Sequence, residues 1–286
     1  MVLSGLHLTL TDFESISMRS SLKWCVLTTI PVVLLSLVPQ CRLWLARGSQ
    51  WQGAYATVDG DEFLYSAYIN ALIDGRPRRN DPFSGRDDHP NAPLPESAFS
   101  IQLLPPLIIS SLAKLFRLTA STSFILLIGF SALSAAITVF WLLKLLTDHD
   151  RLAALGTLFV LLLGTLAAGE GVLAAFFTQD VSRLGLAFLR RYQPAAPFFL
   201  FFAFVGLVYS GLTSARSYCR RLLAALSGVI LGSLIFSYVY LWTAGAAWLV
   251  TMACLYLYLR SDQRRQTIEM IGLITVLSLL ALGPYI

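Results

Sequence analysis

Residues 124–146 read FILLIGFSALSAAITVFWLLKLL, an apolar run whose one charged residue is Lys144. An α-helix rises 1.5 Å per residue, so a run of about 20 apolar residues crosses the hydrocarbon of a bilayer. Because hydrocarbon offers no hydrogen-bonding partner, such a segment satisfies its backbone groups internally, as a helix does. The run therefore predicts a transmembrane helix and sets the fold class of the chain.

Similar apolar runs recur along the rest of the chain. They lie at 24–45, 152–168, 194–212, 222–238, 241–259 and 268–282, with a less regular one at 99–116. The chain is 56% hydrophobic and 13% charged, a balance that would cover a soluble globule in apolar surface. We therefore expect an all-α polytopic integral membrane protein with seven or eight transmembrane helices.

Polar segments divide the chain into four parts. Residues 1–23 are expected to form a cytoplasmic N-terminal segment, in which the basic stretch from Met18 to Lys23 makes Met18 an alternative start to Met1. Residues 24–45 follow as the first transmembrane helix. Residues 46–98 are expected to form one large extracytoplasmic loop containing interfacial helices, and residues 99–286 a multi-helix transmembrane domain.

Basic residues flank the apolar runs, where they set orientation in the membrane. They form four groups: Arg19 and Lys23; Lys144 and Arg151; Arg216, Arg220 and Arg221; and Arg260, Arg264 and Arg265. All four groups can face the cytoplasm if segment 99–116, which contains Pro105-Pro106, does not fully cross. In the alternative, this segment crosses and an irregular crossing lies at 171–189. Either way, the net charge of +5 reflects membrane orientation, and no nucleic-acid partner is predicted.

The large loop contains a predicted surface helix over residues 62–74. Its apolar residues recur at helical spacing and Gly75 provides a stop; they are Leu64, Tyr68, Ala71 and Leu72. Two interpretations of the acids at its start remain open. In the first, Asp59 caps the helix, Glu62 completes a capping box and Asp61 interacts with the helix dipole. In the second, a carboxylate held near the bilayer surface deprotonates an acceptor hydroxyl or binds a divalent cation.

Other polar groups carry less specific signals. The stretch from Arg86 to Asn91 offers carboxylate, imidazole and amide groups, but a solvated turn explains it better than a shared divalent ion, and no metal-ligand spacing is recognised. The four cysteines show no paired spacing, so they predict neither a disulfide framework nor a zinc site. No metal site is therefore predicted.

The segment Asp61-Glu62-x-x-Tyr65, followed by Asp74-Gly75 and Asp81-Pro82-Phe83, resembles the first external loop of GT-C superfamily glycosyltransferases. The resemblance covers roughly residues 24–192. Two later elements, Arg191-Tyr192-Gln193-Pro194 and the aromatic run from Tyr238 to Trp242, are similar to elements of a group of uncharacterised bacterial membrane proteins. The resemblance implies a multi-spanning enzyme that takes a sugar from a polyprenyl phosphate.

The resemblance also assigns residues. Asp61, with Glu62 beside it, takes the catalytic position, and the candidate substrate-binding residues are Tyr65, Arg79, Glu96, Arg190 and Arg191. A guanidinium group binds phosphate bidentately, which favours Arg190 and Arg191 as ligands of the donor phosphate. An ordinary interfacial anchor ahead of a span is the competing explanation for this arginine pair.

The resulting expectation is an inverting glycosyltransferase in the cell envelope, in a bacterial inner (plasma) membrane. Its partners would be the bilayer and the lipid donor, with a divalent cation as the one cofactor considered. Since enzymes of this superfamily commonly carry more spans and a C-terminal domain, the chain is expected to be C-terminally incomplete. The rival interpretations are a transporter or flippase of lipid-linked or small polar substrates, and a non-catalytic envelope protein.

Overall fold

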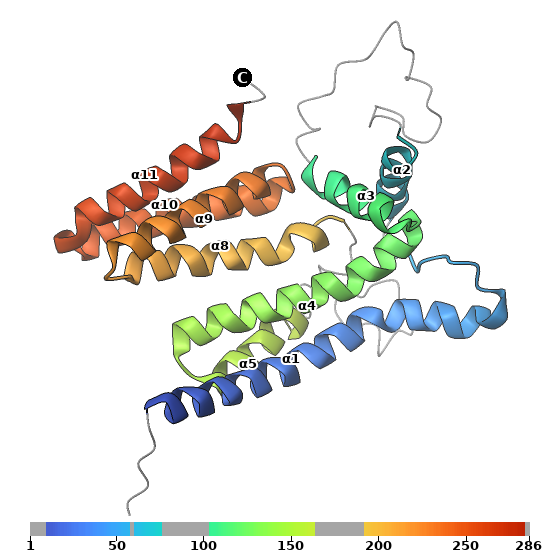
Figure 1. Ribbon diagram of the computed structural model, residues 1–286, viewed down its shortest axis with the longest axis horizontal. Helices are drawn as coiled ribbons and strands as arrows, with labels where there is room; N and C mark the ends of the chain where they lie inside the picture. The colour runs from blue at the N-terminus through green and yellow to red at the C-terminus, as the bar shows by residue number, and fades with distance from the viewer. Residues whose placement is uncertain (1–9, 58–59, 76–102, 164–191, 284–286) are drawn as a thin grey trace, which may run out of the picture.

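The computed structural model describes residues 10–57, 60–75, 103–163 and 192–283, and within these ranges the chain is all-α with no strand (Figure 1). Five of the helices are long and apolar enough to cross a membrane, namely α1 (Leu10–Arg47), α4 (Ala120–Thr147), α8 (Ala195–Thr213), α9 (Ser217–Ile235) and α10 (Val239–Leu259). The all-α membrane fold is thereby supported. The finer count of seven or eight spans stays a prediction.

Shorter elements connect or accompany these helices. They are η1 (Gly48–Gln50), α2 (Asp61–Ile73), α3 (Leu104–Phe116), α5 (Asp150–Leu158), the π-helical turn η3 (Phe159–Leu163), η5 (Ser261–Gln263) and α11 (Arg264–Leu280). Helix α11 is apolar along much of its length, but it begins with Arg264 and Arg265 and contains Glu269. These charges and its length set it apart from the five long apolar helices.

Helix α1 begins at Leu10, well before the predicted start at Trp24. Part of the predicted polar segment 1–23 is therefore helical. No Gly or Pro occurs between Leu6 and Ile30, so nothing in this stretch interrupts the backbone hydrogen-bond ladder. The helix then continues through Pro31 and Pro39 to Arg47.

Helix α3 is 13 residues long, or about 20 Å, which is shorter than the roughly 30 Å of bilayer hydrocarbon. Pro105 and Pro106, at its second and third positions, favour its start. It ends at Arg117 in the left-handed conformation, with the N–H of Leu118 donating to the carbonyl of Ala113 at 2.8 Å. Thr119 then caps α4 by accepting from the N–H of Thr122 at 3.1 Å.

Helix α4 lies at the centre of the molecule, where it contacts α1, α5 and α8 (Figure 1). Its contact with α1 uses small side chains, because Ala132 and Ala136 pack against Val32. A second core forms among α8, α9, α10 and α11, around Phe204 and Ile274. The contact between α4 and α8 joins the two groups of helices.

The helices run in alternating directions, so the molecule has two distinct ends (Figure 1). At one end lie the start of α1 and the α4–α5, α8–α9 and α10–α11 turns, where the four basic groups occur; we term this the basic end. Helices α2 and α3 lie at the opposite end, with the starts of α4, α8 and α10; we term this the α2 end. Helix α3 therefore stays at the α2 end and does not run to the basic end.

Candidate functional site

The acidic motif lies at the start of α2, which confirms the predicted helix over the residues that follow Gly60. Gly60 is the N-cap residue and provides no side-chain cap, so Glu62 is the second helical residue. Gly60 has helical backbone angles, with φ of -60° and ψ of -32°, and the predicted cap Asp59 lies outside the described residues. The capping role of Glu62 therefore stays a prediction. Asp61 is the first helical residue, where the helix dipole favours a carboxylate.

The side of α2 that faces the protein differs from the predicted apolar face. Residues spaced three and four apart, Glu62, Tyr65, Ile69 and Ile73, share one face of a helix. Ile69 is fully buried, and Tyr65 and Ile73 pack in the same cluster. Of the predicted face only Ala71 is buried, whereas Leu64, Tyr68 and Leu72 are half-buried.

The two adjacent acids occupy different environments. Asp61 is exposed, whereas Glu62 is 1% exposed and is the one buried residue with a charged side chain among the residues that the structure describes. The backbone carbonyl of Glu62 accepts a hydrogen bond from the hydroxyl of Tyr55 at 3.1 Å. Of the two carboxylates, only that of Asp61 can therefore contact an acceptor molecule in the aqueous phase without a movement of the helix.

An aromatic stack joins α2 to a segment far along the chain. The rings of Tyr65 and Tyr192 lie 4.5 Å apart between centroids, with an interplanar angle of 29°. Tyr192 is buried and adopts a positive φ of 78°, which is uncommon for a residue with a side chain. The stack places residues 192–194, the described part of the Arg-Tyr-Gln-Pro element, directly beside the acidic helix, a proximity that the spacing in sequence did not predict.

The aromatic run from Tyr238 to Trp242 adjoins the same region. The amide Nε2 of Gln193 donates to the carbonyl of Ser237 at 3.0 Å, and both side chains are buried. The N–H of Leu104 donates to the carbonyl of Phe236 at 3.0 Å, which attaches the start of α3 to the end of α9. The described parts of these three sequence elements, residues 61–75, 192–194 and 238–242, therefore lie together at the α2 end (Figure 1).

The remaining predicted site residues lie outside the described part of the chain. These are Arg79, Glu96, Arg190 and Arg191, together with the polar stretch from Arg86 to Asn91. Within the described ranges, no group of three or more His, Cys, Asp and Glu side chains is placed to hold a metal ion. Asp61, Glu62 and Tyr65 are thus the predicted site residues whose surroundings the structure defines.

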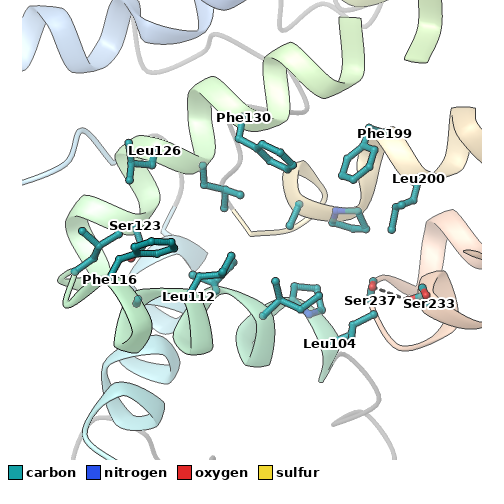
Figure 2. A pocket seen from close by; sticks show the side chains of 18 residues that line it. Leu104, Leu112, Phe116, Ser123, Leu126, Phe130, Phe199, Leu200, Ser233 and Ser237 are labelled. Carbon is teal, nitrogen blue, oxygen red and sulfur yellow. Dashed lines mark hydrogen bonds between the residues drawn. The ribbon is translucent and has the colours of Figure 1, made fainter. Parts of the chain in front are cut away.

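An apolar pocket of about 550 Å³ opens beside this region, between α3, α4, α8 and the end of α9 (Figure 2). Leu112 and Phe116 of α3 face Leu126 and Phe130 of α4 across it, and Phe199 of α8 closes a further side. Phe116 and Phe130 are more than half exposed, so the pocket opens onto the lateral surface of the helix bundle.

The few hydroxyl groups in the pocket are already hydrogen-bonded to the backbone. Ser123, Ser233 and Ser237 donate to the carbonyls four residues before them, at 2.9, 2.9 and 2.6 Å. A polar ligand would therefore gain little inside the pocket, whereas a hydrocarbon chain fits its chemistry. The sequence did not predict this pocket, because its walls come from two pairs of helices, α3 with α4 and α8 with α9, that lie far apart along the chain.

The pocket and the acidic helix share a wall. Ile109 and Leu127 line the pocket and also pack in the cluster that contains Ile69 and Tyr192. The side of the pocket that Ile109 and Leu127 form therefore adjoins the cluster that contains Tyr65 and Tyr192.

No protein-family model, no curated protein and no solved structure matches this chain. The resemblance to GT-C glycosyltransferases consequently stays a prediction. Any functional argument depends on the arrangement of the residues themselves.

Proposed function

We propose that the chain is a membrane glycosyltransferase of the GT-C type, which transfers a sugar from a polyprenyl-phosphate donor to an acceptor hydroxyl at the outer membrane face. One observation carries the proposal. The Tyr65–Tyr192 stack brings the acidic start of α2 next to the segment that follows Arg190 and Arg191, beside a pocket suited to a lipid chain.

The positions of charged and aromatic residues support an orientation in which α2 lies at the outer membrane face. Because basic residues collect on the cytoplasmic side of a membrane, the basic end would face the cytoplasm and the α2 end the outside. Trp24 and Trp44 are separated by about 30 Å along α1, the thickness of bilayer hydrocarbon. Arg151 lies 5.7 Å over the ring of Trp24, and Trp44 contacts Trp51 with centroids 5.8 Å apart. Interfacial tryptophans of this kind would place α2 at the outer surface.

The donor would bind in two parts. Its isoprenoid chain would enter the apolar pocket from the bilayer, since the pocket offers hydrocarbon contacts and its hydroxyls are already paired. Its phosphate would stay at the interface, where Arg190 and Arg191 are the proposed ligands. Arg79 and Glu96 remain further proposed substrate contacts, and Tyr65 would form part of the wall beside the sugar.

The reaction would be a single displacement that inverts the anomeric centre. Asp61, alone or with a divalent cation, would take the proton of the acceptor hydroxyl, whose oxygen then bonds to the anomeric carbon. The bond between that carbon and the phosphate oxygen breaks, and the polyprenyl phosphate leaves with the electron pair. The exposed carboxylate of Asp61 suits this role, because an acceptor from the aqueous side can reach it.

The proposal is tested with purified protein in lipid nanodiscs and polyprenyl phosphates carrying tritiated mannose, glucose or galactose. Transfer of tritium from the lipid to an acceptor fraction is measured for the wild type, Asp61→Asn and Asp262→Asn. We expect Asp61→Asn to lower the rate by about 100-fold or more, as loss of a general base does. Asp262 is exposed and lies at the basic end, so its variant should retain the wild-type rate. Equal rates for both variants would remove Asp61 from the mechanism.

The pocket has a separate test. A photoreactive polyprenyl phosphate should label peptides from α3, α4 and α8 in the wild type, and Ala196→Phe, which fills the pocket, should abolish labelling. Ala253→Phe makes the same substitution in a small groove between α10 and α11 and should not reduce labelling. Labelling without any sugar transfer would favour the rival assignment of a flippase for lipid-linked substrates.

A further inference from the structure

The polar side chain of Gln40 is fully buried in α1. Its Oε1 accepts from the N–H of Ala56 at 2.9 Å, and its Nε2 donates to the carbonyl of Ala54 at 3.3 Å. The side-chain amide thus pairs with the backbone on both sides of Tyr55, much as a neighbouring strand would. This arrangement holds the backbone of Tyr55 in one orientation.

Tyr55 in turn connects this pair of Gln40 hydrogen bonds to α2. Its ring meets the buried ring of Phe124 edge-on, with centroids 5.2 Å apart and an interplanar angle of 89°. Its hydroxyl donates to the backbone carbonyl of Glu62 at 3.1 Å, in the first turn of α2. The phenol therefore spans the distance between the helix α4 and the start of the acidic helix.

The hydrogen bond from Tyr55 attaches the first turn of α2 to the segment that precedes it. Gly60, which precedes this turn, has no side chain that could accept a hydrogen bond from its N–H groups. Asp61 is the first residue of that turn. The direction of its carboxylate therefore depends on the contacts that fix the turn.

We infer that Gln40 and Tyr55 are positioning residues, which hold the first turn of α2 so that Asp61 faces the acceptor. The inference rests on the proposed function, since it takes Asp61 as the group that accepts the proton. A residue within the first membrane helix thereby sets the geometry of an acid at the membrane surface. Neither Gln40 nor Tyr55 touches the pocket that would bind the donor chain.

Two variants remove these contacts with little change in size. Gln40→Met removes both amide hydrogen bonds, and Tyr55→Phe removes a single oxygen atom while keeping the ring on Phe124. Matched controls at the basic end are Gln266→Met, which removes an acceptor of Arg220 Nη1 at 2.6 Å, and Tyr256→Phe in α10. All four are compared with the wild type in nanodiscs, as monodisperse folded protein.

The first measurement is amide hydrogen exchange of a peptide covering residues 60–66. We expect exchange to be about tenfold faster in Gln40→Met and Tyr55→Phe, because local opening of the first turn becomes easier. Both controls should exchange at the wild-type rate there. The second measurement is sugar transfer, for which we expect kcat to fall about fivefold to tenfold with KM for the lipid donor unchanged.

The outcomes distinguish the positioning role of Gln40 and Tyr55 from the proposed glycosyltransferase function. Unchanged exchange in both variants would overturn the positioning role. Faster exchange with unchanged kcat, in a protein that transfers sugar, would also overturn it, because the turn would then not control the reaction. Faster exchange in a protein that transfers no sugar would support the role of Gln40 and Tyr55 in holding the first turn of α2, and would overturn the proposed function. If Gln40→Met does not fold, Tyr55→Phe carries the test alone.

Discussion

The ring of Tyr65 lies stacked on the ring of Tyr192, with centroids 4.5 Å apart. One ring belongs to the acidic helix and the other to the segment that precedes α8. Such aromatic pairs contribute about 0.5–1.5 kcal/mol beyond the apolar area that they bury. This contact therefore stabilises the junction where the candidate site forms.

A double-mutant cycle measures the stack. We expect Tyr65→Leu and Tyr192→Leu to show a coupling of about 0.5–1.5 kcal/mol in the free energy of unfolding, measured by thermal or denaturant unfolding in detergent micelles. A cycle that pairs Tyr65→Leu with Tyr218→Leu is the control, because Tyr218 is exposed at the basic end and its coupling should be near zero. Equal coupling in the two cycles would show that the stack contributes nothing specific.

The contact between α9 and α11 depends on the absence of a side chain at Gly228. A Cβ atom there would lie 2.8 Å from Cβ of Leu277 and 3.2 Å from the carbonyl oxygen of Ile274. Neither neighbour is a flexible chain end, so Gly228→Ala should push the two helices apart and lower the free energy of unfolding by about 1–3 kcal/mol. Unfolding in detergent micelles measures the change.

Gly272→Ala in α11 is the matched control. A Cβ atom at Gly272 would meet nothing within 4 Å, and alanine favours a helix over glycine by about 1 kcal/mol. This variant should therefore be neutral or slightly more stable. A loss of stability as large as that of Gly228→Ala would mean that helix packing does not explain the effect.

An ion pair at the basic end joins α4 to α5. Nζ of Lys144 lies 3.0 Å from Oδ1 of Asp150, whose side chain is 16% exposed. Burial alone would raise the pKa of Asp150, but the Lys144 ammonium and the hydroxyls of Ser20 and Ser21 outweigh it, so the pKa lies below its ordinary value. The carboxylate form therefore contributes stability at neutral pH.

The lowered pKa of Asp150 predicts a pH dependence with a definite sign. The stabilisation is fully present above the pKa of the unfolded chain, about 4, and is lost as the pH falls through the lower folded value. Asp150→Asn should lower the melting temperature at pH 7. Below pH 4, the melting temperature of the variant should fall less than that of the wild type. Differential scanning fluorimetry between pH 3 and pH 7, values chosen to bracket about pH 4, measures both effects.

Asp148→Asn serves as the control for this pair. Asp148 also lies near Lys144, at 3.5 Å, but its side chain is fully exposed, where an ion pair contributes little. It adopts a left-handed conformation with φ of 50°, which asparagine tolerates well. A melting curve like that of Asp150→Asn would contradict the importance of burial at Asp150.

The orientation of the molecule is tested by cysteine labelling in intact cells. In a protein without its four native cysteines, Asn70→Cys on α2 and Ser217→Cys at the start of α9 are each treated with an impermeant maleimide. Both positions are exposed and lie at opposite ends of the bundle. We expect labelling at position 70 alone, since the basic end should face the cytoplasm. Labelling at position 217 instead would reverse the orientation and exclude the proposed outer-face site.

Local patterns in the sequence predicted the local structure well. The apolar runs after Ala120 and Ala195 became long helices, and the residues after Gly60 formed the expected surface helix. Patterns failed where no local signal interrupts a helix. Helix α1, for example, begins at Leu10, earlier than expected. Local patterns also did not predict that Glu62 is buried, because its burial depends on what packs against α2 and not on its own polarity.

The sequence by itself determined an all-α chain with apolar helices long enough to cross a membrane, and with its basic groups and its acidic helix in separate segments. It could do so because hydropathy and helical period act over neighbouring residues. Only the tertiary structure decided that Tyr65 meets Tyr192, that Gln193 meets Ser237, and that four helices enclose an apolar pocket beside them. These contacts join segments far apart in the chain, and they arise from the packing of whole helices, which no local pattern of residues specifies.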